Sequence, residues 1–162
     1  MSFEDRLQKA IERGHRRNLA SAQEAEAKAL SEEELRRLHT GYRLRLSEHI
    51  EQCIRQLPNF FPGFRFETIF GERGWGAACS RDDIRVSSSH RRENDFSRLE
   101  LTVRPATALH VLELAGKGTI RNKEVFNRNV FEKLPDVELD KFVELADAWV
   151  LEYAELYATR VG

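Results

Sequence analysis

The spacing of the apolar residues changes at Pro58, and this change constrains the fold more than any other feature of the sequence. Before Pro58, apolar residues recur every three or four positions, as they do along one side of an α-helix. After Pro58 they alternate with polar residues, as Phe64 and Phe66 do around Arg65, which is typical of a strand with one buried side. A chain of 162 residues is long enough for one domain with a buried core. We therefore predict a single α+β domain over residues 1–162, with a helical N-terminal region (1–58), an antiparallel sheet (59–126) and a C-terminal helix (136–160).

Two patterns that cap helices divide the N-terminal region into two long predicted helices. Ser2 marks the start of the first, and Ser31 with Glu34 marks the start of the second, so we expect a break near Leu30. At about 1.5 Å per residue each helix would be roughly 40 Å long, whereas a compact domain of this length has a radius of gyration of about 15 Å. Helices of this length expose apolar surface unless something covers it. We therefore expect a homo-oligomer or a complex with a protein partner.

The first predicted helix has an apolar side and a basic side. The apolar side follows Phe3, Leu7, Ile11, Asn18, Ala22, Ala25 and Ala29, and the basic side consists of Arg6, Lys9, Arg13, Arg16 and Arg17. A basic amphipathic helix can lie on an anionic membrane, but Glu4, Asp5 and Glu12 flank the basic side, so we interpret it as a solvated face. The sequence shows neither an apolar run of membrane-spanning length nor a signal peptide, so we expect no membrane span and a cytoplasmic protein.

The region after Pro58 predicts four to six strands joined in sequence by hairpins. Residues 71–74 contain two glycines and indicate the first turn, and a polar loop is expected over residues 87–95. The run 116–118, Gly-Lys-Gly, is predicted as a tight hairpin turn because glycine adopts the dihedral angles that such a turn needs. This run lacks the spacing of a phosphate-binding loop, which has a glycine five positions before the Gly-Lys pair and Ser or Thr directly after it.

The segment after residue 136 predicts a helix that packs on the sheet. Its apolar residues cover almost half of its circumference: Leu139, Phe142, Leu145, Ala146, Trp149, Val150, Tyr153, Leu156 and Tyr157. So wide an apolar side is typical of a helix that is buried against a sheet.

Overall charge excludes a globally basic nucleic-acid-binding protein, because 26 basic side chains stand against 27 acidic ones. Arginines are nevertheless dense in the predicted sheet and its loop: Arg85, Arg91, Arg92, Arg98 and Arg104. Together with Trp75 or Phe96 as a stacking platform, they suggest a nucleic-acid-binding surface. Glu93, Asp95 and Glu100 are interleaved with these arginines, as on an ordinary solvent-facing sheet. Nucleic-acid binding is therefore an alternative hypothesis.

A second alternative is a small-molecule site or an enzyme of unrecognised class. Its pocket would lie between the sheet and the helices, around Glu72, Arg73, Trp75 and Asp82. These residues indicate no particular reaction.

The sequence predicts no catalytic residues, no metal site and no cofactor. The five histidines include no pair four residues apart and lie near no pair of cysteines, which argues against zinc. Cys53 and Cys79 both fall among apolar residues, which predicts structural thiols in a reducing compartment. The leading prediction is a non-catalytic interaction module that binds itself or a protein partner.

Overall fold

The computed structural model describes residues 2–86, 89 and 92–161. The chain divides into two compact units, Met1–Arg37 and Leu38–Gly162. Helix α1 (Phe3–Ile54) forms the described part of the first unit and continues into the second. Within the described residues, none of the helices combines the length and the apolar character needed to cross a membrane.

One helix stands where the sequence predicted two, so the expected break near Leu30 is wrong. Ser31 lies inside α1. A Ser-Glu pattern caps a helix only where the preceding backbone leaves the helical conformation. Residues 24–28, Glu-Ala-Glu-Ala-Lys, are all strong helix formers, and they carry the helix through Ser31 instead.

Five antiparallel strands form one sheet in the second unit. They are β1 (Arg65–Ile69), β2 (Trp75–Val86), β3 (Arg92–Val103), β4 (Val111–Ile120) and β5 (Lys123–Lys133). Their order in the sheet is β1-β2-β3-β4-β5, so each strand pairs with its neighbour in sequence. The α+β class and the sequential hairpins are therefore confirmed. Residues 92–95 belong to β3 and not to the predicted loop, of which positions 87, 88, 90 and 91 lie outside the described residues.

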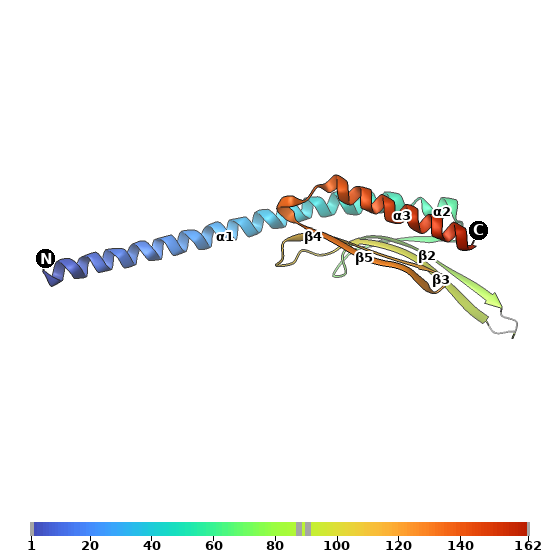
Figure 1. Ribbon diagram of the computed structural model, residues 1–162, viewed down its shortest axis with the longest axis horizontal. Helices are drawn as coiled ribbons and strands as arrows, with labels where there is room; N and C mark the ends of the chain where they lie inside the picture. The colour runs from blue at the N-terminus through green and yellow to red at the C-terminus, as the bar shows by residue number, and fades with distance from the viewer. Residues whose placement is uncertain (1, 87–88, 90–91, 162) are drawn as a thin grey trace. The chain divides into compact units, whose positions relative to one another are not determined.

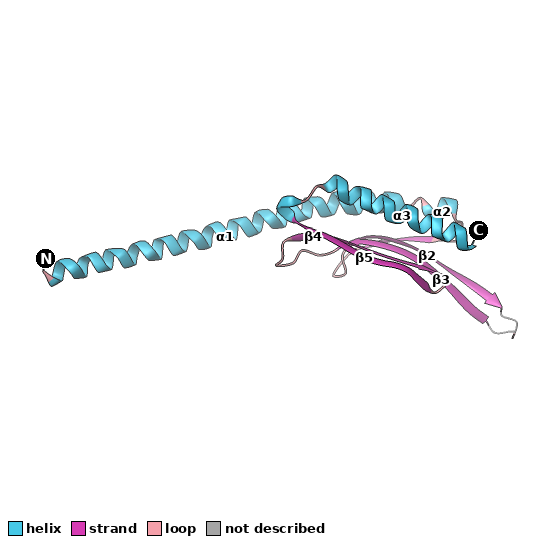
Figure 2. Ribbon diagram, viewed as in Figure 1, coloured by secondary structure: helices cyan, strands magenta, loops and turns pink. Residues whose placement is uncertain are grey.

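Helices cover one face of this sheet. The end of α1, the short α2 (Leu57–Phe60) and α3 (Leu139–Val161) lie on the same side, as Figure 1 and Figure 2 show. A 3-10 helix, η1 (Leu134–Asp136), leads from β5 to α3. The core between these layers includes Leu46, Ile50, Ile54, Ala77, Cys79, Leu99, Leu101, Leu112, Leu114, Trp149 and Tyr153. The predicted packing of the C-terminal helix on the sheet is confirmed.

The turn between β4 and β5 is not where the sequence placed it. Gly116 and Gly118 lie inside β4, so the predicted hairpin at 116–118 is wrong. The chain turns at Arg121 and Asn122, whose φ angles are 45° and 70°. Asn adopts this left-handed region more readily than most residues, so Asn122 is the residue in the sequence that signals the turn.

The two glycines of β4 instead let α3 come close to the sheet. A Cβ atom on Gly116 would lie 2.6 Å from Cε3 of Trp149. A Cβ atom on Gly118 would lie 3.0 Å from Cδ2 of Tyr153. Both distances are too short for carbon atoms in contact, so the aromatic rings occupy the space that side chains on β4 would need.

Replacing Gly116 with Ala should lower the free energy of unfolding by about 1–3 kcal/mol, because the added methyl group overlaps the Trp149 ring. Urea unfolding followed by circular dichroism measures this change. Gly41→Ala is the control: a Cβ there has nothing within 4 Å, and it should raise the stability of the helix by about 0.5–1 kcal/mol. If Gly116→Ala were as stable as the unaltered protein, the close approach of α3 would be contradicted.

Candidate functional site

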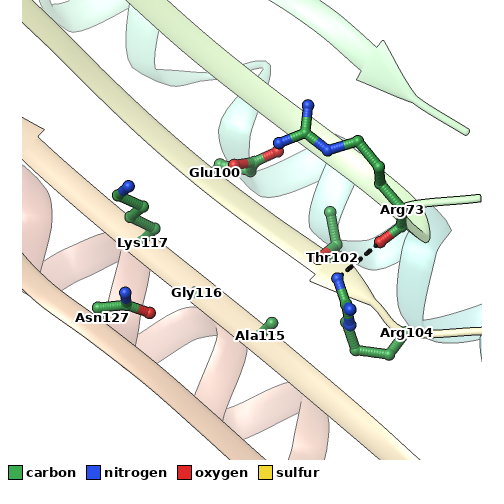
Figure 3. Close-up of a pocket in the computed structure, with 8 residues that line it drawn as sticks. All are labelled: Arg73, Glu100, Thr102, Arg104, Ala115, Gly116, Lys117 and Asn127. Atoms are coloured by element: carbon green, nitrogen blue, oxygen red, sulfur yellow. Dashed lines mark hydrogen bonds between the residues drawn. The ribbon is translucent and has the colours of Figure 1, made fainter.

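The sheet face away from the helices carries polar side chains. Because side chains alternate along a strand, the neighbours of buried Leu99 and Leu101 point to this open face. A shallow groove of about 100 Å³ lies on it, as Figure 3 shows. The groove is lined by Arg73, Glu100, Thr102, Arg104, Ala115, Gly116, Lys117 and Asn127.

The open face carries several of the predicted binding arginines, and Arg98 and Arg104 among them each donate a hydrogen bond within the chain. Arg98 donates from Nη1 to Oε1 of Glu67 at 2.6 Å. Arg104 donates from Nη1 to the carbonyl oxygen of Arg73 at 3.1 Å. Arg73 itself lines the groove.

Among the remaining predicted arginines, Arg92 is exposed at the start of β3, and alternation places it on the same face as Arg98, six residues farther along the strand. The backbone of Arg85 pairs with Glu93, and its side chain lies outside the described residues. Arg91 also lies outside them.

Trp75 does not join the arginines of the open face. Its strand partner is Val103, which belongs to the face that the helices cover. The guanidinium carbon of Arg43, on α1, lies 4.1 Å from the centre of the Trp75 ring. Glu72 is exposed in the turn before β2, and Asp82 is exposed within β2. The structure therefore separates the residues that the sequence analysis grouped around one pocket.

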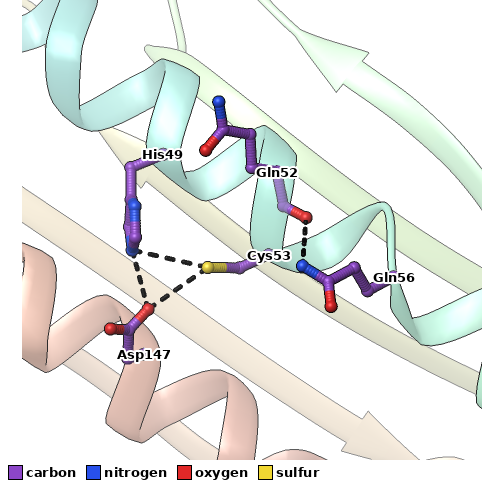
Figure 4. Close-up of polar contacts among 5 residues, drawn as sticks. All are labelled: His49, Gln52, Cys53, Gln56 and Asp147. Atoms are coloured by element: carbon purple, nitrogen blue, oxygen red, sulfur yellow. Dashed lines mark hydrogen bonds and ion pairs between the residues drawn. The ribbon is translucent and has the colours of Figure 1, made fainter.

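A different cluster of polar side chains joins α1 to α3. His49 and Cys53 are four residues apart on α1 and project from the same side of it, and Asp147 faces them from α3, as Figure 4 shows. Asp147 Oδ1 lies 2.7 Å from His49 Nε2 and accepts a hydrogen bond from Cys53 Sγ at 3.2 Å. Cys53 Sγ and His49 Nε2 are 3.4 Å apart. We call these three residues the His49–Cys53–Asp147 cluster.

The geometry of this cluster does not match a nucleophilic triad. In a triad, the histidine uses one ring nitrogen for the nucleophile and the other for the carboxylate. Here the same atom, His49 Nε2, is nearest to both Cys53 Sγ and Asp147 Oδ1. His49 Nε2, Cys53 Sγ and Asp147 Oδ1 therefore surround one point instead of forming a chain of hydrogen bonds.

The thiol of Cys53 is protonated in this setting. Burial, the hydrogen bond to Asp147 and the negative charge of Asp147 together raise the pKa of Cys53 to about 12. A protonated thiol is a poor nucleophile. Burial also raises the pKa of Cys79 to about 12, and this second thiol is fully buried in the core, as the sequence predicted.

An apolar groove begins beside the cluster. It has a volume of about 220 Å³, and Cys53 and Asp147 line one end of it. Leu57, Phe60 and Leu151 are among the residues that continue it. The side chains of Phe60 and Leu151 are 75% and 68% exposed, so the groove opens to solvent.

Neither a pair of closely spaced histidines nor a pair of closely spaced cysteines marks this cluster in the sequence. The signal within α1 was the mixed pair, His49 and Cys53, at a spacing of four residues. The third member could not be recognised from spacing, because Asp147 is 94 residues from Cys53 in the chain.

No protein-family model, no curated protein and no solved structure matches this chain. The proposals that follow rest on the geometry and chemistry of its own residues.

Replacing Asp147 with Ala should make Cys53 react several-fold faster with iodoacetamide, because the carboxylate is one of the causes that raise the pKa of the thiol. The rate is measured at mildly alkaline pH in a Cys79→Ser background, so that only Cys53 reports. Glu144→Ala, which removes an exposed carboxylate elsewhere on α3, should leave the rate unchanged. An unaltered rate in Asp147→Ala would contradict the contact between the thiol and the carboxylate.

Proposed function

We propose that this protein is a self-associating interaction module whose N-terminal helix pairs with the same helix of a second copy. One observation carries the proposal: every residue from Phe3 to Lys28 is exposed. These include Phe3, Leu7, Ile11 and Leu19, which are 74%, 49%, 50% and 62% exposed. Helices in proteins owe most of their stability to the packing of an apolar side, and pairing with another helix would supply that packing.

The charges of the N-terminal unit favour a second copy in antiparallel orientation as the partner. Residues 3–19 carry five basic and three acidic side chains, whereas residues 20–37 carry three basic and five acidic ones. An antiparallel pair places the basic half of each helix beside the acidic half of the other. A parallel pair would place like charges together, which is unfavourable.

The small side chains near the middle of this segment fit such a crossing. The basic residues Arg6 to Arg17 and the acidic residues Glu24 to Glu34 are arranged about a midpoint near Ser21. Ala22 and Ala25 follow Ser21 on the apolar side of the helix, and small residues at the crossing allow two helix axes to approach closely.

One specific pair of charges follows from this midpoint. Arg17 and Glu24 are seven residues apart, so they lie on the same side of the helix. In an antiparallel pair centred near Ser21, Arg17 of each copy lies beside Glu24 of the other. Pairs at these flanking positions determine the orientation of paired helices.

The nucleic-acid alternative has less support than self-association. Arg98 is paired with Glu67, so its guanidinium already has an acidic partner. Arg43 lies over the ring of Trp75 and covers the face on which a base would stack. Arg98 would have to give up its ion pair with Glu67 before it could bind a phosphate.

The double substitution Leu7→Glu with Ile11→Glu should abolish self-association, because it places charges in the middle of the apolar side. Sedimentation equilibrium of the full chain over a range of concentrations measures the dissociation constant. The matched control, Gln23→Glu with Ala27→Glu, adds the same charge on the opposite side of the helix and should leave association largely intact. A monomeric unaltered protein would overturn the proposal.

Exchanging the flanking charges tests the orientation. Arg17→Glu alone and Glu24→Arg alone should each weaken the dimer several-fold, because each places like charges together across the pair. The chain that carries both substitutions should regain most of the lost affinity, since the opposite charges then face each other again. If the double substitution were as weak as the sum of the single ones, the antiparallel arrangement would be wrong.

A further inference from the structure

The donor atoms of the His49–Cys53–Asp147 cluster are a nitrogen, a sulfur and an oxygen. These ligand atoms all lie within 4.8 Å of one another. Two come from successive turns of α1 and the third from α3, so helix packing brings them together without a loop. Figure 4 shows the three side chains pointing toward a common centre.

We propose that His49, Cys53 and Asp147 form a three-ligand binding site for a zinc ion, with a fourth coordination position that faces the adjacent apolar groove. Zinc is bound in proteins by imidazole nitrogen, thiolate sulfur and carboxylate oxygen, and sites with three protein ligands leave one position for water or another ligand. Magnesium and calcium require oxygen ligands, so a thiol in the set argues against both.

The spacing of the donor atoms is close to what zinc requires. With metal–ligand bonds of about 2.0–2.3 Å and tetrahedral angles, the donor atoms would be separated by roughly 3.3–3.6 Å. The observed separations are 3.4 Å for sulfur and nitrogen, 3.2 Å for sulfur and oxygen, and 2.7 Å for nitrogen and oxygen. The triangle has to open by a few tenths of an ångström, most of it between His49 and Asp147. Their side chains are 27% and 45% exposed, so both have room to rotate.

Zinc binding replaces the hydrogen bonds of the cluster with metal–ligand bonds. The Cys53 thiol loses its proton to solvent and binds as a thiolate, so one proton is released for each zinc ion bound. His49 binds through Nε2 as a neutral imidazole, with its proton on Nδ1. Asp147 binds as the carboxylate. The resulting site carries no net charge, because two negative ligands neutralise the divalent ion.

The groove indicates where the fourth ligand comes from. Cys53 and Asp147 are both part of its wall, whereas Leu57, Phe60 and Val150 supply apolar surface beyond them. A water molecule, or the metal-binding head of a small molecule with an apolar tail, reaches the zinc from this side. The site therefore resembles metal centres with an open position more than closed structural ones.

Cobalt(II) titration of the full, reduced chain tests the proposal directly, because a thiolate bound to cobalt gives a charge-transfer absorption and tetrahedral cobalt absorbs strongly in the visible region. We expect one equivalent to bind with both signals, and zinc to displace the cobalt. Cys53→Ser should lose the charge-transfer band, and His49→Gln and Asp147→Asn should each weaken binding at least about tenfold. Cys79→Ser is the matched control, because its thiol lies in the core away from the cluster, and it should bind as the unaltered protein does.

Thermal unfolding provides a second readout that does not depend on colour. A concentration of zinc about a hundredfold above the dissociation constant should raise the Tm of the unaltered protein and of Cys79→Ser by roughly 5–10 °C. The three ligand variants should unfold cooperatively without metal and show no comparable shift. Absence of thiolate–cobalt absorption in the unaltered protein, or an equal response from Cys53→Ser, would overturn the proposal.

Discussion

The close approach of α3 to β4 is the contact on which the arrangement of the second unit depends. Trp149 and Tyr153 occupy the space above Gly116 and Gly118, and the Tyr153 hydroxyl donates to the carbonyl oxygen of Thr119 at 2.8 Å. These contacts fix the distance between α3 and the sheet, and they fix the position of α3 along β4. Asp147 precedes Trp149 by two residues, so the same contacts place its carboxylate opposite Cys53. The polar cluster is thus a consequence of how the core packs.

The class of fold could be predicted because it follows from local patterns. The change from helical to alternating spacing at Pro58 predicted the helices and the strands, and sequential hairpins were the simplest topology for those strands. The position of the last hairpin could not be predicted in this way. Glycine permits a tight turn and also permits close packing, and only Trp149, far along the chain, decides which role Gly116 has.

The candidate site was predictable only in part, for a related reason. The spacing of His49 and Cys53 can be read from the sequence, but their contact with Asp147 depends on the packing of two helices that are distant in the chain.

The capping pattern at Ser31 predicted a helix start that the structure does not have. Such a pattern occurs both at the start of a helix and inside one, and the strong helix formers before Ser31 continue the helix here. Of the two predicted aromatic platforms, Trp75 lies on the opposite face of the sheet from Arg98, whereas Phe96, two residues before Arg98 on β3, lies on the same face.

The two proposals concern different units and stand on separate observations. Self-association rests on the exposed apolar and charged residues of the first unit, whereas the zinc site rests on three side chains of the second unit. Neither requires the other. A dimer would link two copies of the second unit, each with its own groove.

We propose that the N-terminal helix pairs in antiparallel orientation with that of a second copy. The most direct test is the distance between spin labels on the two copies, measured by pulsed electron spin resonance after Ser2→Cys or Ser21→Cys in a chain whose native cysteines are replaced by serine. Antiparallel pairing places labels at position 21 close together and labels at position 2 about 55 Å apart, from a rise of about 1.5 Å per residue. A short distance at position 2, or no coupling at either position, would contradict it.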